Sequence, residues 1–474
     1  MAVAARSARR TDLQGPRVPG YWHTSAPYPT SHDRTARSDH NRQIARRTSI
    51  DARRHQTGSM RGLFMSHVLI VGGGFAGVWS AASAAKLRRE CGATDADLSI
   101  TVVNAGDDLV IRPRLYESDP HTMRVPLDQV LGPIGVQRLT ATVTSIDTVA
   151  KTATAVSRDG RSSDISYDRL VLASGSQVVQ PKVPGAAHMF DVDTLAGAAR
   201  LDSHLHRLPE RTTSAGRYTV VVVGAGFTGL EIATELTRRL REIADNRATV
   251  RVVLVEREGE VGPELGEGPR PAIISALSDL SIETRLNVSV ESVNTDGVTL
   301  SDGAKIAAAT VIWTAGMAAS PLTKFIPAER DWIGRLSVDK FLRVTGTSDV
   351  YAAGDTSAAS ATEGRTVMQS CQHAMPLGKF AGHNVAADLL GEPLVPFAAD
   401  EYRTCLALGP AGAVVTSGWD RTVLMAGAAG HHLKTTINTE WIYPPVNDRE
   451  ALFAMAGPNG SLPEYTPPAS LSVS

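Results

Sequence analysis

Two stretches of the sequence share one pattern, VLIVGGGFAGVWSA (68–81) and VVVVGAGFTGLEIA (220–233). In each, an apolar run typical of a buried strand leads into GxGxxG and then into a helical segment, the context in which this motif binds a dinucleotide. The first glycine permits a tight turn, the second lets the backbone approach a pyrophosphate, and the third lets helix pack on strand. These glycines are Gly72, Gly74, Gly77, Gly224, Gly226 and Gly229. Two such loops in one chain predict two bound dinucleotides and hydride transfer between them.

The spacing after each loop indicates a duplicated unit. Asn104 ends the second expected strand of the first unit and lies 32 residues after Gly72; Glu256 ends its counterpart 32 residues after Gly224. This spacing exceeds the usual distance of about 20 residues, so we expect a long crossover helix or return loop in both units. Equal spacing supports duplication of a strand–helix–strand unit more strongly than the glycines alone.

The order of segments predicts an α/β protein with two Rossmann-like dinucleotide-binding domains, the second inserted in the first, and a smaller α+β C-terminal domain. We assign residues 65–180 and 317–395 to an FAD-binding domain and residues 181–316 to an NAD(H)-binding domain. A helix is expected over 371–391. Residues 396–474 read as short strands and turns that form an interface or acceptor domain.

Residues 1–64 are predicted to be a disordered leader, because they are rich in Arg, Ser and Pro and poor in large aliphatic residues. An Arg-rich, acid-poor start also fits a transit peptide, but four aspartates weaken that interpretation. Met60 and Met65 lie just before the first expected strand, so we favour an upstream extension of the reading frame. No apolar run is long enough to span a bilayer. We therefore expect a cytoplasmic protein with at most peripheral contact on the inner face of the cell membrane.

The composition disfavours several classes of function. The formal net charge is −1, so nothing points to a nucleic-acid partner. The three cysteines, Cys91, Cys371 and Cys405, form no CxxC or CxxxxC pair, and neither they nor the histidines have metal-ligand spacing. We expect no metal and no redox disulfide, while a homodimer remains compatible with the sequence.

The residues that end the two second strands predict the choice of nucleotide. A carboxylate at Glu256 can accept hydrogen bonds from ribose hydroxyls and repels a 2′-phosphate, which favours NADH over NADPH. Arg257 follows at once and partly offsets that preference. Asn104 can bond a ribose hydroxyl without charge; alternatively it is a turn residue, and the role falls to Asp107 or Asp108.

Asp355 in VYAAGDT is the most specific candidate outside the glycine loops. A carboxylate at a strand end can accept a hydrogen bond from a ribityl hydroxyl of a flavin. The alternative is an ordinary cap of a following helix. The flavin interpretation depends on the combination of Asp355 with the first glycine loop.

The series GGGFAG, LASGS, GAGFTGLE, WTAG and YAAGD resembles the two-dinucleotide-binding-domain flavoprotein superfamily, and within it the type II NADH dehydrogenase family. The resemblance runs from about Ser66 to about Leu390. It implies FAD in the first domain, NADH in the second and a quinone as the electron acceptor. Electrons would leave near helix 371–391 and the C-terminal domain.

The resemblance also implies roles for particular residues. Glu231, in GLE, would orient the nicotinamide or relay a proton, and Gln372 matches a residue of the family's quinone-site helix. The implied cofactor residues are Gly72, Gly74, Phe75, Ala76, Gly77, Asn104, Arg114, Gly175, Gly316, Gly354 and Asp355, with Gly224, Gly226, Gly229 and Glu256 for NADH.

Two departures from the family leave the acceptor open. Pro376 and Leu377 replace the family's double glutamine, and the tail has no basic amphipathic anchor. A reductase of a small electron-carrier protein and a slow-turnover nicotinamide sensor therefore stay as alternatives. His373 can protonate a reduced acceptor if the helix points at the flavin, although a lone histidine is more often structural.

Overall fold

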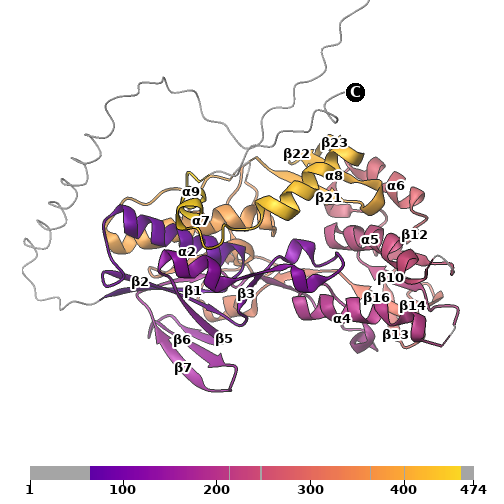
Figure 1. The fold of residues 1–474 in the computed structure, drawn as a ribbon, viewed down its shortest axis with the longest axis horizontal. Helices are drawn as coiled ribbons and strands as arrows, with labels where there is room; N and C mark the ends of the chain where they lie inside the picture. The colour runs from indigo at the N-terminus through magenta and orange to yellow at the C-terminus, as the bar shows by residue number, and fades with distance from the viewer. Residues whose placement is uncertain (1–64, 213, 246–247, 363, 400, 461–474) are drawn as a thin grey trace, which may run out of the picture.

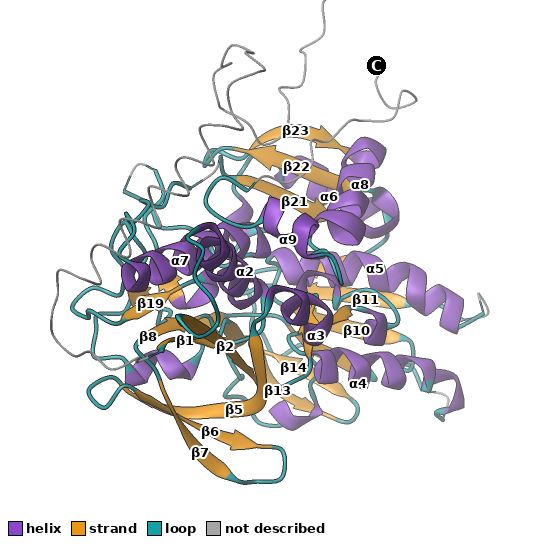
Figure 2. Ribbon diagram, turned by 60° about the vertical axis from the view of Figure 1, so that its left-hand side comes forward, coloured by secondary structure: helices purple, strands orange, loops and turns teal. Residues whose placement is uncertain are grey.

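The computed structural model describes residues 65–460, apart from 213, 246–247, 363 and 400. The leader predicted over 1–64 and the end of the chain lie outside the described residues. The two largest sheets are mainly or wholly parallel and carry packed helices, and the described C-terminal part forms a smaller antiparallel sheet (Figures 1 and 2). The prediction of an α/β fold with Rossmann-like sheets is confirmed.

The first sheet forms around the VLIV run of the first motif. Its strand order is β19-β8-β1-β2-β5-β6-β7, and the five strands from β19 to β5 run parallel. Valine, leucine and isoleucine run nearly unbroken along β1 because the parallel part is covered on both faces. Its strands are β1 (Ser66–Val71), β2 (Leu98–Asn104), β5 (Gln137–Asp147), β6 (Thr152–Ser157), β7 (Ser162–Ser166), β8 (Arg169–Leu172) and β19 (Val350–Ala352).

The second sheet repeats this plan with the VVVV run at its centre. Its order is β12-β11-β10-β16, and all four strands are parallel. In both sheets the strand before the glycine loop lies between two neighbours, so the loop sits where successive connections diverge, which is where open α/β sheets bind ligands. The elements of this part are α4 (Leu195–His206), β10 (Thr219–Val223), α5 (Phe227–Ile243), β11 (Arg251–Val255), α6 (Arg270–Asp279), β12 (Glu283–Arg285) and β16 (Thr310–Trp313). A meander of β13 (Val290–Asn294), β14 (Gly297–Leu300) and β15 (Lys305–Ala307) follows α6 and β12.

Two helices far apart in sequence, α2 (Phe75–Glu90) and α7 (Cys371–Leu390), lie side by side (Figures 1 and 2). Gly378 and Gly382 make this close crossing possible. A Cβ at Gly378 would lie 2.4 Å from the Ala76 carbonyl oxygen, and one at Gly382 would lie 2.0 Å from that of Ser80. Because the backbones touch, the start of α7 is held beside the first glycine loop.

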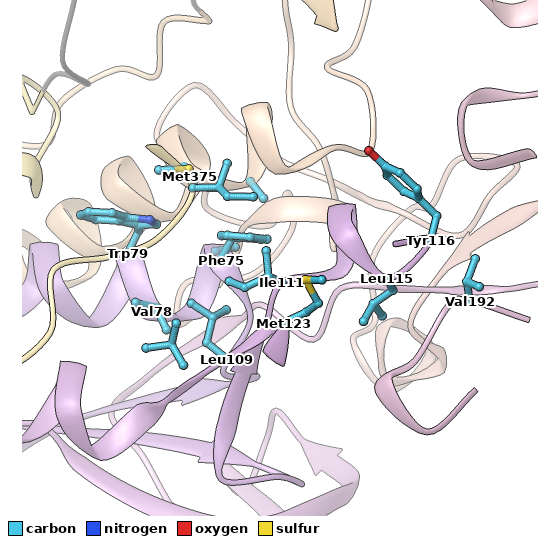
Figure 3. Close-up of a cluster of buried hydrophobic side chains, with 14 of the residues drawn as sticks. Phe75, Val78, Trp79, Leu109, Ile111, Leu115, Tyr116, Met123, Val192 and Met375 are labelled. Carbon is cyan, nitrogen blue, oxygen red and sulfur yellow. The ribbon is translucent and has the colours of Figure 1, made fainter. Parts of the chain in front are cut away.

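A buried apolar cluster packs around the start of α2, next to the first glycine loop (Figure 3). Phe75 and Trp79 on α2 pack with Met375 on α7 and with side chains of the segment 109–123. This segment carries β3 (Asp108–Val110) and β4 (Arg124–Pro126), and the helix α3 (Leu127–Leu131) follows it. Burial at this density fixes the loop because small changes in volume are felt by all neighbours.

The C-terminal part contains more helix than the short strands and turns that we expected. β21 (Arg403–Ala407), β22 (Ala413–Ser417) and β23 (Thr422–Ala426) form an antiparallel sheet next to α5. The TTINTEW segment then completes α8 (Gly427–Thr436) and a π-helical turn (Ile437–Trp441), and α9 (Arg449–Met455) follows. Local β-propensity is overridden by burial, because Leu433 and Trp441 lie on one helical face against Val415.

Among the described helices, none is both long enough and apolar enough to cross a membrane.

Candidate active site

One cavity of about 1990 Å³ opens between the two parallel sheets, and both glycine loops line it. A pocket for one small ligand has a volume of about 300–1,000 Å³, so this cavity has room for more than one such ligand. From the first loop Gly74 and Ala76 reach the wall, and from the second loop Gly224 and Gly226 do. The prediction that two dinucleotides are held together is therefore compatible with a single shared space.

Within each loop, different glycines are required for different structural reasons. A Cβ at Gly77 would lie 1.8 Å from the Gly72 carbonyl oxygen, and one at Gly229 would lie 1.8 Å from that of Gly224. These glycines let helix and strand approach each other. A Cβ at Gly74 or at Gly226, by contrast, would meet nothing within 4 Å.

The two middle glycines therefore leave room in the cavity itself. Gly74 begins α2 and Gly226 begins α5, and no side chain caps either helix. The first N–H groups of a helix need acceptors, and the helix dipole favours an anion there. Both loops thus fit a pyrophosphate, as the sequence predicts.

Asn104 and Glu256 occupy equivalent positions and hold their loops in the same way. Asn104 Oδ1 accepts a hydrogen bond from the Gly73 N–H at 2.9 Å, and Glu256 Oε2 accepts one from the Ala225 N–H at 2.7 Å. Glu256 also lines the cavity, whereas Asn104 is absent from its described wall. Asn104 thus acts in the structure as a loop anchor, while Glu256 combines this role with a position at the cavity.

Asp355 lies in the cavity wall at the start of a short turn of helix, residues Gly354–Thr356. Its Oδ2 accepts a hydrogen bond from Ser176 Oγ at 2.6 Å, and burial raises the pKa of its carboxyl. The residue that caps this turn is Ala353, so Asp355 is not the helix cap that the alternative interpretation required. A buried carboxyl on the cavity wall fits a flavin hydroxyl, since such a group needs further hydrogen-bond donors.

Of the two arginines in RPR, Arg112 lines the described cavity wall, whereas Arg114, the predicted cofactor residue, is absent from it. Arg112 forms an ion pair with Asp193 and donates to the Ser176 carbonyl oxygen at 3.2 Å. Arg114 turns away, because its guanidinium is bound by Glu117 at 2.7 Å and by the Tyr443 hydroxyl at 2.9 Å. The motif RPR contains two arginines, and only their partners in the folded structure show which of them lines the cavity.

Glu231 forms a buried ion pair that the sequence did not predict. Its Oε1 lies 2.9 Å from Nζ of Lys434 on α8, and it also accepts a hydrogen bond from the Ala407 N–H at 3.1 Å. Both side chains line the cavity. Burial acts to lower the pKa of Lys434, but the Glu231 carboxylate beside it raises the pKa above its ordinary value. The Lys434 side chain therefore stays charged at this wall.

Gln372 and His373, at the start of α7, have different surroundings. Gln372 lines the cavity, whereas His373 is absent from its described wall; its Nδ1 lies 3.0 Å from Ser370 Oγ, and its ring stacks on Tyr402. Burial lowers the pKa of His373 to about 4, so the ring is neutral at pH 7. A neutral ring argues against the predicted proton-donor role of His373, which stays a prediction.

The structure thus brings most of the predicted residues to one space. Those on the cavity wall are Gly74, Phe75, Ala76, Gly175, Gly224, Gly226, Glu231, Glu256, Gly316, Gly354, Asp355 and Gln372. Those that shape the loops or lie behind the described wall are Gly72, Gly77, Asn104, Arg114, Gly229 and His373. Cys371 and Cys405 also line the wall as free thiols, and burial raises the pKa of both.

No group of three or more His, Cys, Asp or Glu residues within the described ranges is arranged to hold a metal ion.

The Glu231–Lys434 pair predicts a characteristic pattern of stability. We expect Glu231→Gln and Lys434→Met each to lower the free energy of unfolding by about 3–5 kcal/mol, because each leaves one buried charge without its partner. The double variant should lose much less than the sum. Urea unfolding followed by circular dichroism measures the three values, and additive losses would show that the two side chains do not interact.

Comparison with known proteins agrees with this geometry. The model of the pyridine nucleotide-disulphide oxidoreductase family matches residues 66–378. An NADH dehydrogenase-like protein of Mycobacterium tuberculosis is 46% identical over 398 residues, covering 83% of this chain and 98% of that protein. A type II NADH:quinone oxidoreductase of Staphylococcus haemolyticus is 27% identical over 79% of this chain and 95% of its own length.

Among solved structures, NDH2 from Plasmodium falciparum in complex with NADH superposes with a TM-score of 0.67, covering 82% of this chain and 96% of that one. Its sequence is only 13% identical, so this likeness concerns the fold alone. The family model covers well over half of the chain, and the mycobacterial relative extends the match to 83% of it. The chain belongs to the pyridine nucleotide-disulphide oxidoreductase family.

Proposed function

We propose that the protein is an FAD-dependent oxidoreductase that takes electrons from NADH and passes them to a quinone. The observation that carries this proposal is the single cavity into which two uncapped helix N-termini point, one from each glycine loop. The names of the mycobacterial and staphylococcal relatives support NADH as donor, and the staphylococcal one supports a quinone as acceptor. The domain division expected from the sequence, with FAD on the first loop and NADH on the second, is part of this proposal.

FAD, when bound, supplies the chemistry: it accepts a hydride from the nicotinamide and releases the two electrons to the second substrate. The protein binds the two cofactors and orients them. The N–H groups that follow Gly74 would hold the flavin pyrophosphate, and Asp355 would accept from a flavin hydroxyl. On the second loop, the N–H groups after Gly226 would hold the NADH pyrophosphate, and Glu256 would accept from the adenosine ribose.

The Glu231–Lys434 pair would supply a proton at the acceptor end. Reduction of a quinone to a quinol takes up two electrons and two protons, so protons must reach both oxygens of the ring. Lys434 stays protonated because Glu231 lies 2.9 Å away, and its ammonium faces the same cavity as Gln372. Gln372 would donate a hydrogen bond to a quinone oxygen and so position it.

Apolar side chains at this end of the cavity would exclude water from the transfer. Met375 and Pro376 on α7 and Val395 and Pro396 after it line the wall beside Gln372. A flat, apolar acceptor can be buried among them, whereas the folded domain of an electron-carrier protein cannot enter. This argument favours a quinone over a protein acceptor despite the missing double glutamine.

We further propose a cytoplasmic protein with peripheral contact to the inner face of the membrane, where a lipid-soluble quinone resides, and a homodimer as its assembly. Sedimentation of the full chain with and without anionic lipid vesicles tests both parts. Cosedimentation with vesicles is expected; a monomer that stays in the supernatant would contradict them.

The role of Glu256 predicts a change in nucleotide preference. Glu256→Gln keeps an oxygen for the Ala225 N–H but removes the charge that repels a 2′-phosphate. We expect the ratio of kcat/KM for NADH to that for NADPH to fall by about tenfold. Glu260→Gln, at an exposed side chain that pairs with Arg270, serves as the control and should leave the ratio unchanged. An unaltered ratio in Glu256→Gln would remove the residue from ribose recognition.

The proposed function as a whole is tested by anaerobic titration with NADH while the flavin absorbance is recorded. Stoichiometric bleaching is expected, followed by recovery of the oxidised spectrum when a menaquinone analogue is added. Bleaching that only a small electron-carrier protein reverses would favour a carrier reductase, and bleaching that nothing reverses quickly would favour a nicotinamide sensor. Purified protein without flavin would contradict the proposal.

A further inference from the structure

Trp332 is an unusual residue at the mouth of the cavity. Its side chain is 91% exposed, yet it lines the cavity together with the neighbouring Ile333. Large aromatic side chains are normally at least partly buried, and an exposed one at the rim of a ligand cavity is informative. None of the roles assigned above uses this residue.

The turn that carries Trp332 is held rigidly. Asp331 Oδ1 accepts hydrogen bonds from the N–H groups of Ile333 at 3.1 Å and Arg335 at 2.9 Å, and its Oδ2 accepts from Arg335 Nε at 2.7 Å. The Ile333 carbonyl oxygen accepts from the Ala319 N–H at 2.8 Å. The indole is therefore presented by a fixed backbone, which lowers the entropic cost of using it as a contact surface.

The sheet order places this turn on one side of the second glycine loop. In the order β12-β11-β10-β16, the loop follows the central β10, Glu256 follows β11 on one side, and Gly316 follows β16 on the other. A dinucleotide with its adenosine ribose at Glu256 and its pyrophosphate at the loop directs its nicotinamide half toward Gly316. Residues Met317–Ala319 come directly after it as β17, and Ala319 is the residue bound to Ile333.

The same side faces the expected flavin site. Ser176 Oγ lies 3.0 Å from Met317 Sδ and donates to Asp355 Oδ2 at 2.6 Å. Met317, 37% exposed, and Val179, 47% exposed, line the cavity beside Gly316 and make an apolar rim with Trp332. The rim thus lies between the second loop and Asp355, where the two cofactors must meet.

The chemistry of the rim selects an uncharged ring over a phosphate. Arg335, which follows this turn and lines the cavity, is engaged by the protein, since its Nε binds Asp331, its Nη1 binds the Val367 carbonyl oxygen and its Nη2 binds Thr366 Oγ1. The flat indole and the side chains of Met317 and Val179 are among the groups that these segments present to the cavity. Such a surface suits stacking with a heterocycle.

We propose that Trp332 is a binding residue for the nicotinamide half of the dinucleotide, stacking on it at the cavity mouth and setting its affinity. This inference rests on the proposed function, because it takes NADH as the ligand of the second loop. Trp332 forms no bond in the reaction and acts through binding alone. It should therefore affect KM and leave kcat at saturating NADH unchanged.

The test compares three variants of the full-length flavoprotein. Trp332→Ala is expected to raise the KM for NADH and the Kd for NAD⁺ by about three- to tenfold, with flavin content and kcat unchanged. Trp332→Phe, which keeps an aromatic face, should stay within about twofold of the parent. Phe325→Ala is the matched control, because Phe325 is an aromatic residue 43% exposed on a neighbouring turn and absent from the described cavity wall.

A second readout follows the indole itself. The difference in fluorescence between the parent protein and Trp332→Phe isolates the emission of Trp332, and NAD⁺ should quench it. Emission that is unaffected by NAD⁺ but shifts to the blue with lipid vesicles would assign the rim to a membrane and overturn the inference. Unchanged KM and Kd in Trp332→Ala would overturn it as well. If the parent flavin is not reduced by NADH at all, the proposed function fails first, so the two failures are distinguishable.

Discussion

Two helices that begin without a cap and face the same cavity are the constraint on which the rest of this structure depends. A helix N-terminus leaves N–H groups without partners and carries a partial positive charge. Here α2 and α5 both start at a glycine whose missing side chain leaves open space in front of the helix. No side chain caps either end, so an anion placed there would be stabilised. The cavity therefore presents two positive helix ends to any anion that enters it.

The residues that end the second strand of each unit, Asn104 and Glu256, share one structural role but differ in charge. Asn104 and Glu256 each accept a hydrogen bond from the N–H of the residue that follows the first glycine. That bond fixes the loop in either unit and needs only an oxygen. The carboxylate adds a negative charge at the cavity wall, and the amide does not. The two units therefore share the hydrogen bond that fixes the loop, and only the second adds a negative charge at the cavity wall.

Sequence patterns predicted the parts of this molecule that depend on local rules. The glycine loops, the buried parallel strands and helix 371–391 follow from steric requirements and hydrophobic periodicity, and they are found where expected. Sequence patterns did not predict the features that depend on tertiary contacts.

Lys434 lies about 200 positions from Glu231, and nothing in the sequence near Lys434 indicates that the two form an ion pair. TTINTEW has β-branched residues but is helical, because Leu433 and Trp441 are buried against the small sheet. Arg112 and Arg114 are indistinguishable until Asp193 and Glu117 bind them separately.

The Glu231–Lys434 pair ties the C-terminal part to the site that the two parallel sheets create. Glu231 belongs to α5, directly after the second glycine loop, and Lys434 belongs to α8. A buried ion pair contributes little net stability compared with apolar packing, but separating its members is costly. The pair therefore adds little to the stability of the fold. It does make the packing of α8 against α5 necessary, because each buried charge is stable only while its partner is beside it. This requirement keeps an ammonium group at the cavity wall, so the segment with the least recognisable sequence contributes a positive charge to the same space that the two glycine loops line.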